Sequence, residues 1–175
     1  MVARDNRPAE IFSAPFDMTA QVSTVMAIVF LLGSAMALNV ALADGALTIL
    51  ARIYTIAAIL LAGAGWGSSV RAYELGGDGI SIVRFLRRRN IAFDQIESIT
   101  PIDFIGRENI HGLGVFPGIF GYQKNIEIDG IEGVITALSN RIDRGVLIRT
   151  AHYSVFISPE RAPDFVRSLE SILAK

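Results

Sequence analysis

The fold is decided by a run of 26 residues without a charged side chain, MTAQVSTVMAIVFLLGSAMALNVALA, at positions 18–43. A helix of about 20 residues crosses a hydrocarbon core of about 30 Å, so this run is long enough to span a membrane. A second run of 18 uncharged residues, IYTIAAILLAGAGWGSSV, occupies positions 53–70, and apolar residues between 46 and 51 lengthen it. Arg52 lies near its start, where a long side chain can reach the interface. Two membrane-spanning helices are predicted.

Each run has an alternative interpretation as a buried helix of a soluble protein, and the first also as a signal peptide. A signal peptide has an apolar core of about 7 to 15 residues. The first run is longer than that, begins at residue 18 and is followed at once by the second. The two-span interpretation is therefore preferred. Asp44 and Gly45 form so short a link that the helices must make a tight antiparallel hairpin.

Small residues recur at four-residue spacing in both runs. They are Gly33, Ala37 and Ala41 in the first, and Ala58 and Ala62 in the second. Such stripes allow close approach of helices in lipid, but glycine and alanine are also simply common in membrane helices. Asn39 is the one strongly polar side chain in the later half of the first run. It can bond across the hairpin, bond between protomers, or be solvated near an interface.

The orientation of the hairpin follows from the basic residues near its ends. The link side offers only Arg52, whereas the other side has Arg4, Arg7, Arg71, Arg84, Arg87, Arg88 and Arg89. Cytoplasmic loops carry an excess of Lys and Arg, so both termini are predicted to be cytoplasmic. We therefore expect a multi-pass protein of the cell (inner) membrane with its C-terminal domain in the cytoplasm.

The remaining 105 residues, 71–175, carry 13 basic and 13 acidic side chains and are long enough for one core of their own. The chain thus divides into an N-terminal tail (1–17), a transmembrane hairpin (18–70) and a β-rich domain (71–175). Short alternating segments predict about seven strands, with Pro101 placing its strand at an edge or a bulge. The segments are 73–75, 80–85, 90–93, 96–102, 125–128, 133–138, 146–150 and 153–157.

One amphipathic helix is predicted at the C-terminus. Ser158, Pro159 and Glu160 are typical of an N-cap, a first-turn proline and an acid near the positive end of a helix dipole. The apolar face that follows consists of Phe165, Val166, Leu169, Ile172 and Leu173. We expect an α+β domain, an antiparallel barrel or sandwich that is open at one end and plugged by this helix.

The glycine-rich stretch at 112–122 predicts a loop that keeps its aromatic residues packed. It does not match a phosphate-binding loop, because no Gly-x-Gly-x-x-Gly joins a strand to a helix and no Lys-Ser or Lys-Thr follows. Nucleotide binding is not expected, and a net charge of −1 gives no reason to expect nucleic-acid binding.

The order of elements resembles a pleckstrin-homology (PH) domain, and more closely the bacterial PH-domain membrane proteins with one or two spans before such a domain. The resemblance extends over about Ala9 to Leu173. It rests on the segments 73–75, 79–82, 91–99, 117–121 and 157–169. It implies a membrane-tethered binding or scaffold module, possessing a PH-like fold and no known reaction.

Eukaryotic PH domains that bind phosphoinositides use basic residues around the first hairpin loop. The loop here, Gly76-Gly77-Asp78-Gly79, is acidic and lacks Lys and Arg. The basic residues Arg84, Arg87, Arg88 and Arg89 come after it. They are candidates for contact with anionic lipid, each contributing roughly 1 kcal/mol near a charged surface; the alternatives are a solvated loop or a topology signal.

No catalytic, cofactor or metal site is predicted. The chain has no cysteine, and its two histidines, His111 and His152, are not in a metal-type spacing. Two hypotheses follow. One is a non-catalytic membrane-anchored module that binds a protein partner or forms a homo-oligomer. The other is a lipid-active or transport-accessory protein in which Asn39, Arg52 and the three consecutive arginines contact headgroups.

Overall fold

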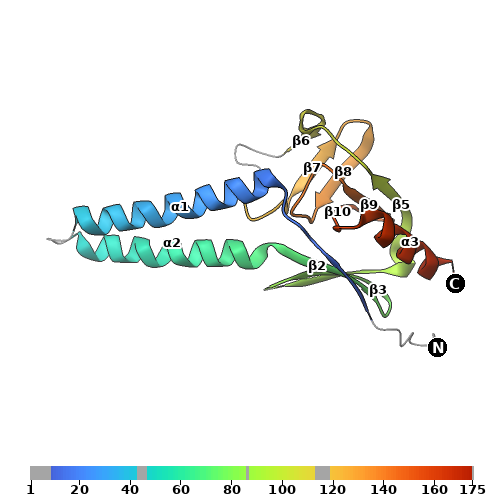
Figure 1. Ribbon diagram of the computed structural model, residues 1–175, viewed down its shortest axis with the longest axis horizontal. Coiled ribbons are helices and arrows are strands. Elements are labelled where there is room, and N and C mark those ends of the chain that lie inside the picture. Colours follow the sequence, from blue (N-terminus) through green and yellow to red (C-terminus); the bar gives the residue numbers. More distant parts are fainter. Residues whose placement is uncertain (1–8, 43–46, 86, 113–118, 175) are drawn as a thin grey trace.

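The computed structural model of the protein describes residues 9–42, 47–85, 87–112 and 119–174. Two long helices, α1 (Met18–Ala41) and α2 (Thr48–Ser68), lie side by side and antiparallel, and join a β-rich domain at one end (Figure 1). At 1.5 Å per residue they are about 36 and 31 Å long. Both are long and apolar enough to cross a membrane. The predicted Asp44-Gly45 link lies outside the described residues.

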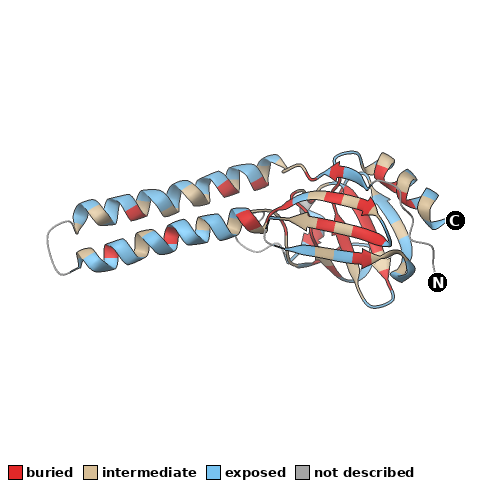
Figure 2. Cartoon of the chain, turned by 90° about the horizontal axis from the view of Figure 1, so that it is seen from below, coloured by how far each residue is buried: buried red, intermediate tan, exposed pale blue. Residues whose placement is uncertain are grey.

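The two helices are apolar on nearly all sides, yet most of their surface is uncovered (Figure 2). Val29, Phe30 and Leu60 are 62, 74 and 65% exposed. A helix that is apolar all round belongs in a core or in a bilayer, and the protein itself does not cover these two. Their outer surface is therefore suited to lipid.

Polar side chains join α1 to α2 along the hairpin. Asn39 Nδ2 donates to Thr55 Oγ1 (2.6 Å), so this asparagine bonds across the hairpin. The hydroxyls of Ser34 and Tyr54 are 2.8 Å apart. The predicted stripe of Gly33, Ala37 and Ala41 is exposed instead of lying at the contact. The buried small residues at the contact are Ala35, Ala51 and Ala58.

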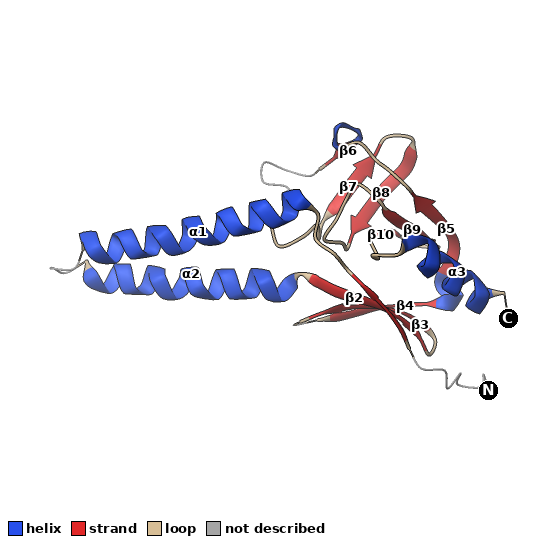
Figure 3. Ribbon diagram, viewed as in Figure 1, coloured by secondary structure: helices blue, strands red, loops and turns tan. Residues whose placement is uncertain are grey.

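The β-rich domain contains two sheets. The first has the order β1-β2-β3-β4 and is antiparallel throughout. Its strands are β1 (Glu10–Ser13), β2 (Val70–Gly76), β3 (Gly79–Arg84) and β4 (Arg88–Ala92). Strand β1 precedes the helices in sequence, and no strand was predicted there. The helical hairpin is therefore inserted between two neighbouring strands of one sheet (Figure 3).

The second sheet has the order β5-β9-β10-β8-β7-β6. Its strands are β5 (Ile96–Ile102), β6 (Ile110–His111), β7 (Asn125–Ile128), β8 (Ile131–Ala137), β9 (Gly145–Thr150) and β10 (Ser154–Ile157). Strand β10 lies between β9 and β8 and is parallel to β8. The strand containing Pro101, β5, is at the edge, as expected. Its irregularity lies between Ile96 and Ser98, whereas Pro101 pairs in register with Val146.

The two sheets share an apolar cluster that helix α3 (Ala162–Leu173) completes. A second cluster packs the second sheet against Ala20 of α1. Phe165 of α3 meets Phe12 of β1 edge to face, with ring centroids 5.1 Å apart. Tyr73 of β2 is fully buried, donates from its hydroxyl to the Leu138 carbonyl (3.0 Å) and accepts from the Ser158 amide (3.1 Å). One phenol thus links the first sheet to two segments next to the second.

The predicted start of the C-terminal helix is wrong. The helix begins at Ala162, Pro163 occupies its first turn, and Arg161 is the N-cap residue without a side-chain cap bond. Ser158 is instead buried at the exit of β10, where its amide bonds Tyr73. The predicted apolar face is confirmed for Phe165, Val166 and Leu169, which are buried.

The expected fold class is confirmed: a helical hairpin, then a PH-like α+β domain closed by a C-terminal helix. Three details differ in the described residues. There are ten strands instead of about seven, β8 and β10 are parallel, and the sheets do not close into a barrel. The barrel is open because the edges of the two described sheets do not pair, neither β4 with β5 nor β1 with β6. The 3-10 turn Phe93–Gln95 separates β4 from β5.

We predict an alkaline loss of stability that depends on Tyr73. Burial raises the pKa of Tyr73 to about 12 from 10.0, against the lowering effect of the hydrogen bond from Ser158. The folded protein then holds this proton more tightly than the unfolded chain, so its stabilising effect is complete below pH 10 and is lost as pH rises towards 12. The loss amounts to about 2 to 3 kcal/mol.

The measurement is denaturant unfolding of the detergent-solubilised chain at pH 9 and at pH 12. Tyr73→Phe should be less stable at pH 9 but should lose less stability on going to pH 12. Tyr153→Phe, the same change at a half-buried position, should keep the wild-type pH dependence. Equal pH dependence in Tyr73→Phe and wild type would contradict the prediction.

Candidate functional site at the junction of the helices and the domain

The site is the junction where the chain enters α1 and leaves α2. Both connecting segments meet Asn140, which lies between β8 and β9 and is fully buried. Its Nδ2 donates to the carbonyls of Ala14 (2.8 Å) and Val70, and its Oδ1 accepts from the Val70 amide (3.2 Å). The Asn140 carbonyl also accepts from the Asp17 amide (3.1 Å). One residue therefore clamps both ends of the helical hairpin to the domain.

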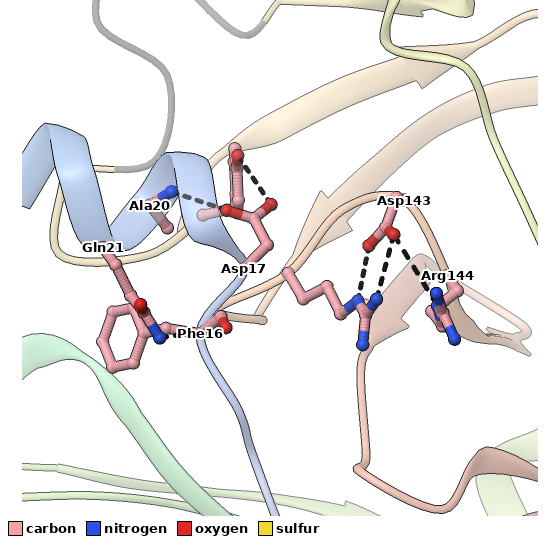
Figure 4. A network of polar contacts seen from close by, with 8 residues as sticks. Phe16, Asp17, Ala20, Gln21, Asp143 and Arg144 are labelled. Atoms are coloured by element: carbon pink, nitrogen blue, oxygen red, sulfur yellow. Dashed lines mark hydrogen bonds and ion pairs between the residues drawn. The ribbon is translucent and has the colours of Figure 1, made fainter.

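Asp17 forms a second link at the start of α1 (Figure 4). Its Oδ1 accepts from the Ala20 amide (2.5 Å) and so caps the helix, while its Oδ2 accepts from the Tyr122 hydroxyl (3.1 Å). Tyr122 is fully buried beside β7 and β8. The carboxylate thus ties the first turn of α1 to the core of the second sheet.

An ion-paired loop lies close to this junction. Arg141 Nε donates to Asp143 Oδ1 (2.6 Å), and Arg144 approaches Asp143 Oδ2 at 3.6 Å (Figure 4). Burial alone would raise the pKa of Asp143, but the hydrogen bond and charge of Arg141 and the charge of Arg144 hold it below its usual value. The loop after Asn140 is therefore ionised and internally paired near neutral pH.

Phe120 packs against both helices. Its amide donates to Thr24 Oγ1 of α1 (2.9 Å), and its ring lies where any side chain at Gly65 of α2 would overlap it. Phe120 has a φ of 57°, a region that residues other than glycine seldom adopt. This conformation places the ring against the helix pair, and the expectation that the glycine-rich loop packs its aromatic residues holds for Phe120 and Tyr122. Residues 113–118 of that stretch lie outside the described residues.

Gln123 connects the end of α2 to the first sheet. Its Nε2 donates to the Ser68 carbonyl (2.5 Å), and its Oε1 accepts from Arg84 Nη1 (2.9 Å). Arg84 is the last residue of β3, and its Nε is buried without a partner among the described residues. Burial, then the charges of Arg89 and Arg87, lower the pKa of Arg84. Gln123 thereby holds the end of β3 next to the last turn of α2.

The four candidate lipid-contacting arginines do not form one patch. Arg88 pairs with Glu74 (3.2 Å), whereas the guanidinium of Arg89 lies over the ring of Tyr153, 5.1 Å from its centroid. Successive side chains of a strand point to opposite faces, which separates these two neighbours. Arg84 and the exposed Arg87 lie at the end of the sheet next to α2, where the Arg84 amide bonds the Arg87 carbonyl (3.1 Å). Contact of the four with lipid stays a prediction.

The histidines lie outside the junction. His111 Nε2 is 3.0 Å from Asp129 Oδ1, and both side chains are exposed, as is His152. Within the described ranges, no group of three or more His, Asp or Glu side chains is placed to hold a metal ion. The junction offers buried hydrogen bonds and cations, which suit attachment and recognition more than bond-breaking chemistry.

Sequence reasoning did not find the residues of the clamp. Asn140 falls between the predicted strands 133–138 and 146–150, and nothing local marks it, because its partners are 70 and 126 residues away. Asp17 did carry a signal, because an acid directly before an apolar run is typical of an N-cap.

Residues 71–173, more than half of the chain, match the protein-family model described as Bacterial PH domain. Comparisons with curated proteins and with solved structures gave no match.

We predict that the Asn140 clamp is a principal source of stability. Asn140→Ala removes three hydrogen bonds and leaves buried backbone groups of Ala14 and Val70 unpaired, which should cost about 2 to 4 kcal/mol. Thermal unfolding of the solubilised chain, followed by near-ultraviolet circular dichroism, measures this loss. Asn125→Ala, which removes one exposed hydrogen bond to Thr136, is the matched control and should change stability by less than about 0.5 kcal/mol. If Asn140→Ala changed stability as little as Asn125→Ala does, the proposed role of the clamp would be refuted.

Proposed function

This chain belongs to the bacterial PH domain family, and we propose that it is a non-catalytic binding or scaffold module anchored in the inner membrane. In this proposal residues 18–70 form the transmembrane hairpin and residues 71–175 the binding domain on the cytoplasmic side. Residues 1–17 precede the hairpin, and strand β1 within them returns to the domain. The partner is a protein or a second copy of the chain.

The observation that carries the anchor is the uncovered apolar surface of α1 and α2. Met26, Phe30 and Leu60 are each more than 60% exposed. Leaving so many large apolar side chains in water would cost about 25 cal/mol for each Å². The basic residues near the domain end of the hairpin, such as Arg71 and Arg87, favour a cytoplasmic domain.

The family supports the binding or scaffold role, because PH domains are generally non-catalytic binding modules. The clamp at Asn140 and the contact of Phe120 with both helices add to this support. They attach the domain to the anchor through buried bonds instead of a flexible linker. A partner would therefore meet the domain in one orientation relative to the membrane.

A second candidate function is binding of anionic lipid headgroups through Arg84, Arg87, Arg88 and Arg89. The observation that favours it is the location of Arg84 and Arg87 beside the end of α2. Arg87 is exposed and has no ion-pair partner among the described residues. Arg88 and Arg89 are already engaged by Glu74 and Tyr153, so Arg87 should contribute most.

We predict that both ends of the chain are cytoplasmic. A reporter that is active only in the periplasm should be silent when fused after Lys175, and the same reporter inserted after Asp44 should be active. A reporter active only in the cytoplasm should give the opposite pattern. Periplasmic activity at Lys175 would overturn the proposed topology, and equal activity at both positions would overturn the hairpin.

The lipid alternative predicts that Arg87→Ala weakens the preference of the reconstituted chain for phosphatidylglycerol over phosphatidylcholine. A loss of about 1 kcal/mol per arginine corresponds to roughly a five-fold change at the site. Electron paramagnetic resonance of spin-labelled lipids measures this preference. Arg167→Ala, an exposed arginine on α3, should leave it unchanged. If Arg87→Ala and Arg167→Ala had the same preference for phosphatidylglycerol, lipid binding through Arg87 would be contradicted.

A further inference from the structure

The end of the first sheet that carries Phe85 lies next to the last turn of α2. Val70, two residues after the end of α2, pairs with Arg84 at the end of β3. The other end of the same strand pair is the turn at Gly76 and Gly79. Figures 1 and 3 show the β3–β4 end of the sheet directed back towards the helices. Phe85 therefore lies where α2 would leave the bilayer.

Side-chain bonds fix the level of this sheet end relative to α2. Arg84 donates to Gln123, and Gln123 donates to the carbonyl of Ser68, the last residue of α2. The Arg84 amide also bonds the Arg87 carbonyl and so closes the end of the β3–β4 pair. Phe85 follows Arg84 directly and cannot move far along the helix axis without breaking this chain of bonds.

The residues at this level have the composition of a membrane interface. Phe85 is 66% exposed, and the Arg71 guanidinium lies over its ring, 5.0 Å from the centroid. Trp66, in the last turn of α2, is 53% exposed and stacks on Phe16, with ring centroids 6.4 Å apart. Aromatic rings and arginines gather where headgroups meet acyl chains, because rings suit the boundary and guanidinium groups suit phosphate.

We propose that Phe85 inserts into the headgroup layer of the membrane that α1 and α2 cross, with Arg71 and Arg87 binding the phosphates of anionic lipids. This inference rests on the proposed membrane anchor. The occupant is a lipid surface because Phe85 is level with the exposed Trp66 at the end of an apolar helix. In addition, neither Arg71 nor Arg87 has an ion-pair partner among the described residues.

This contact gives the domain a third attachment to the membrane besides the two helices. It lies at the end of β2 and β3 opposite the acidic turn Gly76–Gly79. The domain would therefore rest on the bilayer through Phe85 and leave that turn, the β4 edge and α3 free for a partner.

The test uses the full chain, whose single tryptophan, Trp66, is a natural reporter. Phe85→Trp and, as control, Leu173→Trp are each made with Trp66→Phe. Leu173 is the last residue of α3 and is 39% exposed. The C-terminal end of α3 is directed away from α1 and α2 (Figure 1). The proteins are reconstituted into vesicles of phosphatidylcholine and phosphatidylglycerol that carry bromine near the headgroup end of the acyl chains.

Bromine quenches tryptophan on contact, and apolar groups at a membrane interface lie about 5–10 Å deep. A tryptophan at position 85 would therefore touch the bromine atoms, and we expect roughly half of the Phe85→Trp emission to be lost. The Leu173→Trp emission should be unchanged. If wild-type Trp66 is quenched and Phe85→Trp is not, the inference is overturned while the anchor stands. If Trp66 is also unquenched, the proposed anchor fails as well.

Cysteine labelling provides a second measurement, because the chain has no cysteine of its own. Phe85→Cys and Leu173→Cys are treated with a membrane-impermeant maleimide in inverted membrane vesicles and in detergent. Phe85→Cys should label slowly in vesicles and fast in detergent, whereas Leu173→Cys should label fast in both. Fast labelling of Phe85→Cys in vesicles would overturn the inference even if Phe85→Trp fails to fold.

Discussion

The structure depends on one buried amide, the side chain of Asn140. Its two donors and its acceptor are all used, and every partner is a backbone group of a segment that enters or leaves the helical hairpin. A buried amide that is fully bonded is stable in one arrangement, since any shift leaves polar groups unpaired in a low dielectric. The hairpin and the β domain therefore meet in a single defined way. Strand β2 of the first sheet begins at Val70, one of the residues that Asn140 binds.

The core repeats this use of one polar group to connect distant segments. The Tyr73 hydroxyl bonds Leu138 and Ser158, which follow β8 and β10, while the Tyr73 ring contributes to the apolar core with Phe165 of α3. Helix α3 and these bonds hold together two sheets that do not pair edge to edge at β4 and β5. The two sheets are thus held together without strand pairing between β4 and β5.

Local patterns predicted the elements whose signals are local. The uncharged runs located α1 and α2, and alternation located β5 and β7 with the observed bounds. Strand β1 was missed because it is only four residues long and its partner, β2, begins after both long apolar helices. Ser158 and Pro159 match the residue pattern of a helix start, but the helix begins at Ala162. The neighbouring arginines Arg88 and Arg89 suggested a patch, but strand geometry directs them apart, and Asn140 has partners too distant in sequence to be inferred.

A junction clamped at both of its connecting segments makes the helices and the domain turn as one body. Membrane helices adjust their tilt to the thickness of the bilayer, so in the proposed anchor each change in tilt would rotate the whole domain through the same angle. The sheet end at Arg84, close to the junction, would move little, whereas the turn at Gly76 and Gly79, at the other end of the same strand pair, would move farther. Bilayer thickness would in this way set the direction in which that turn points.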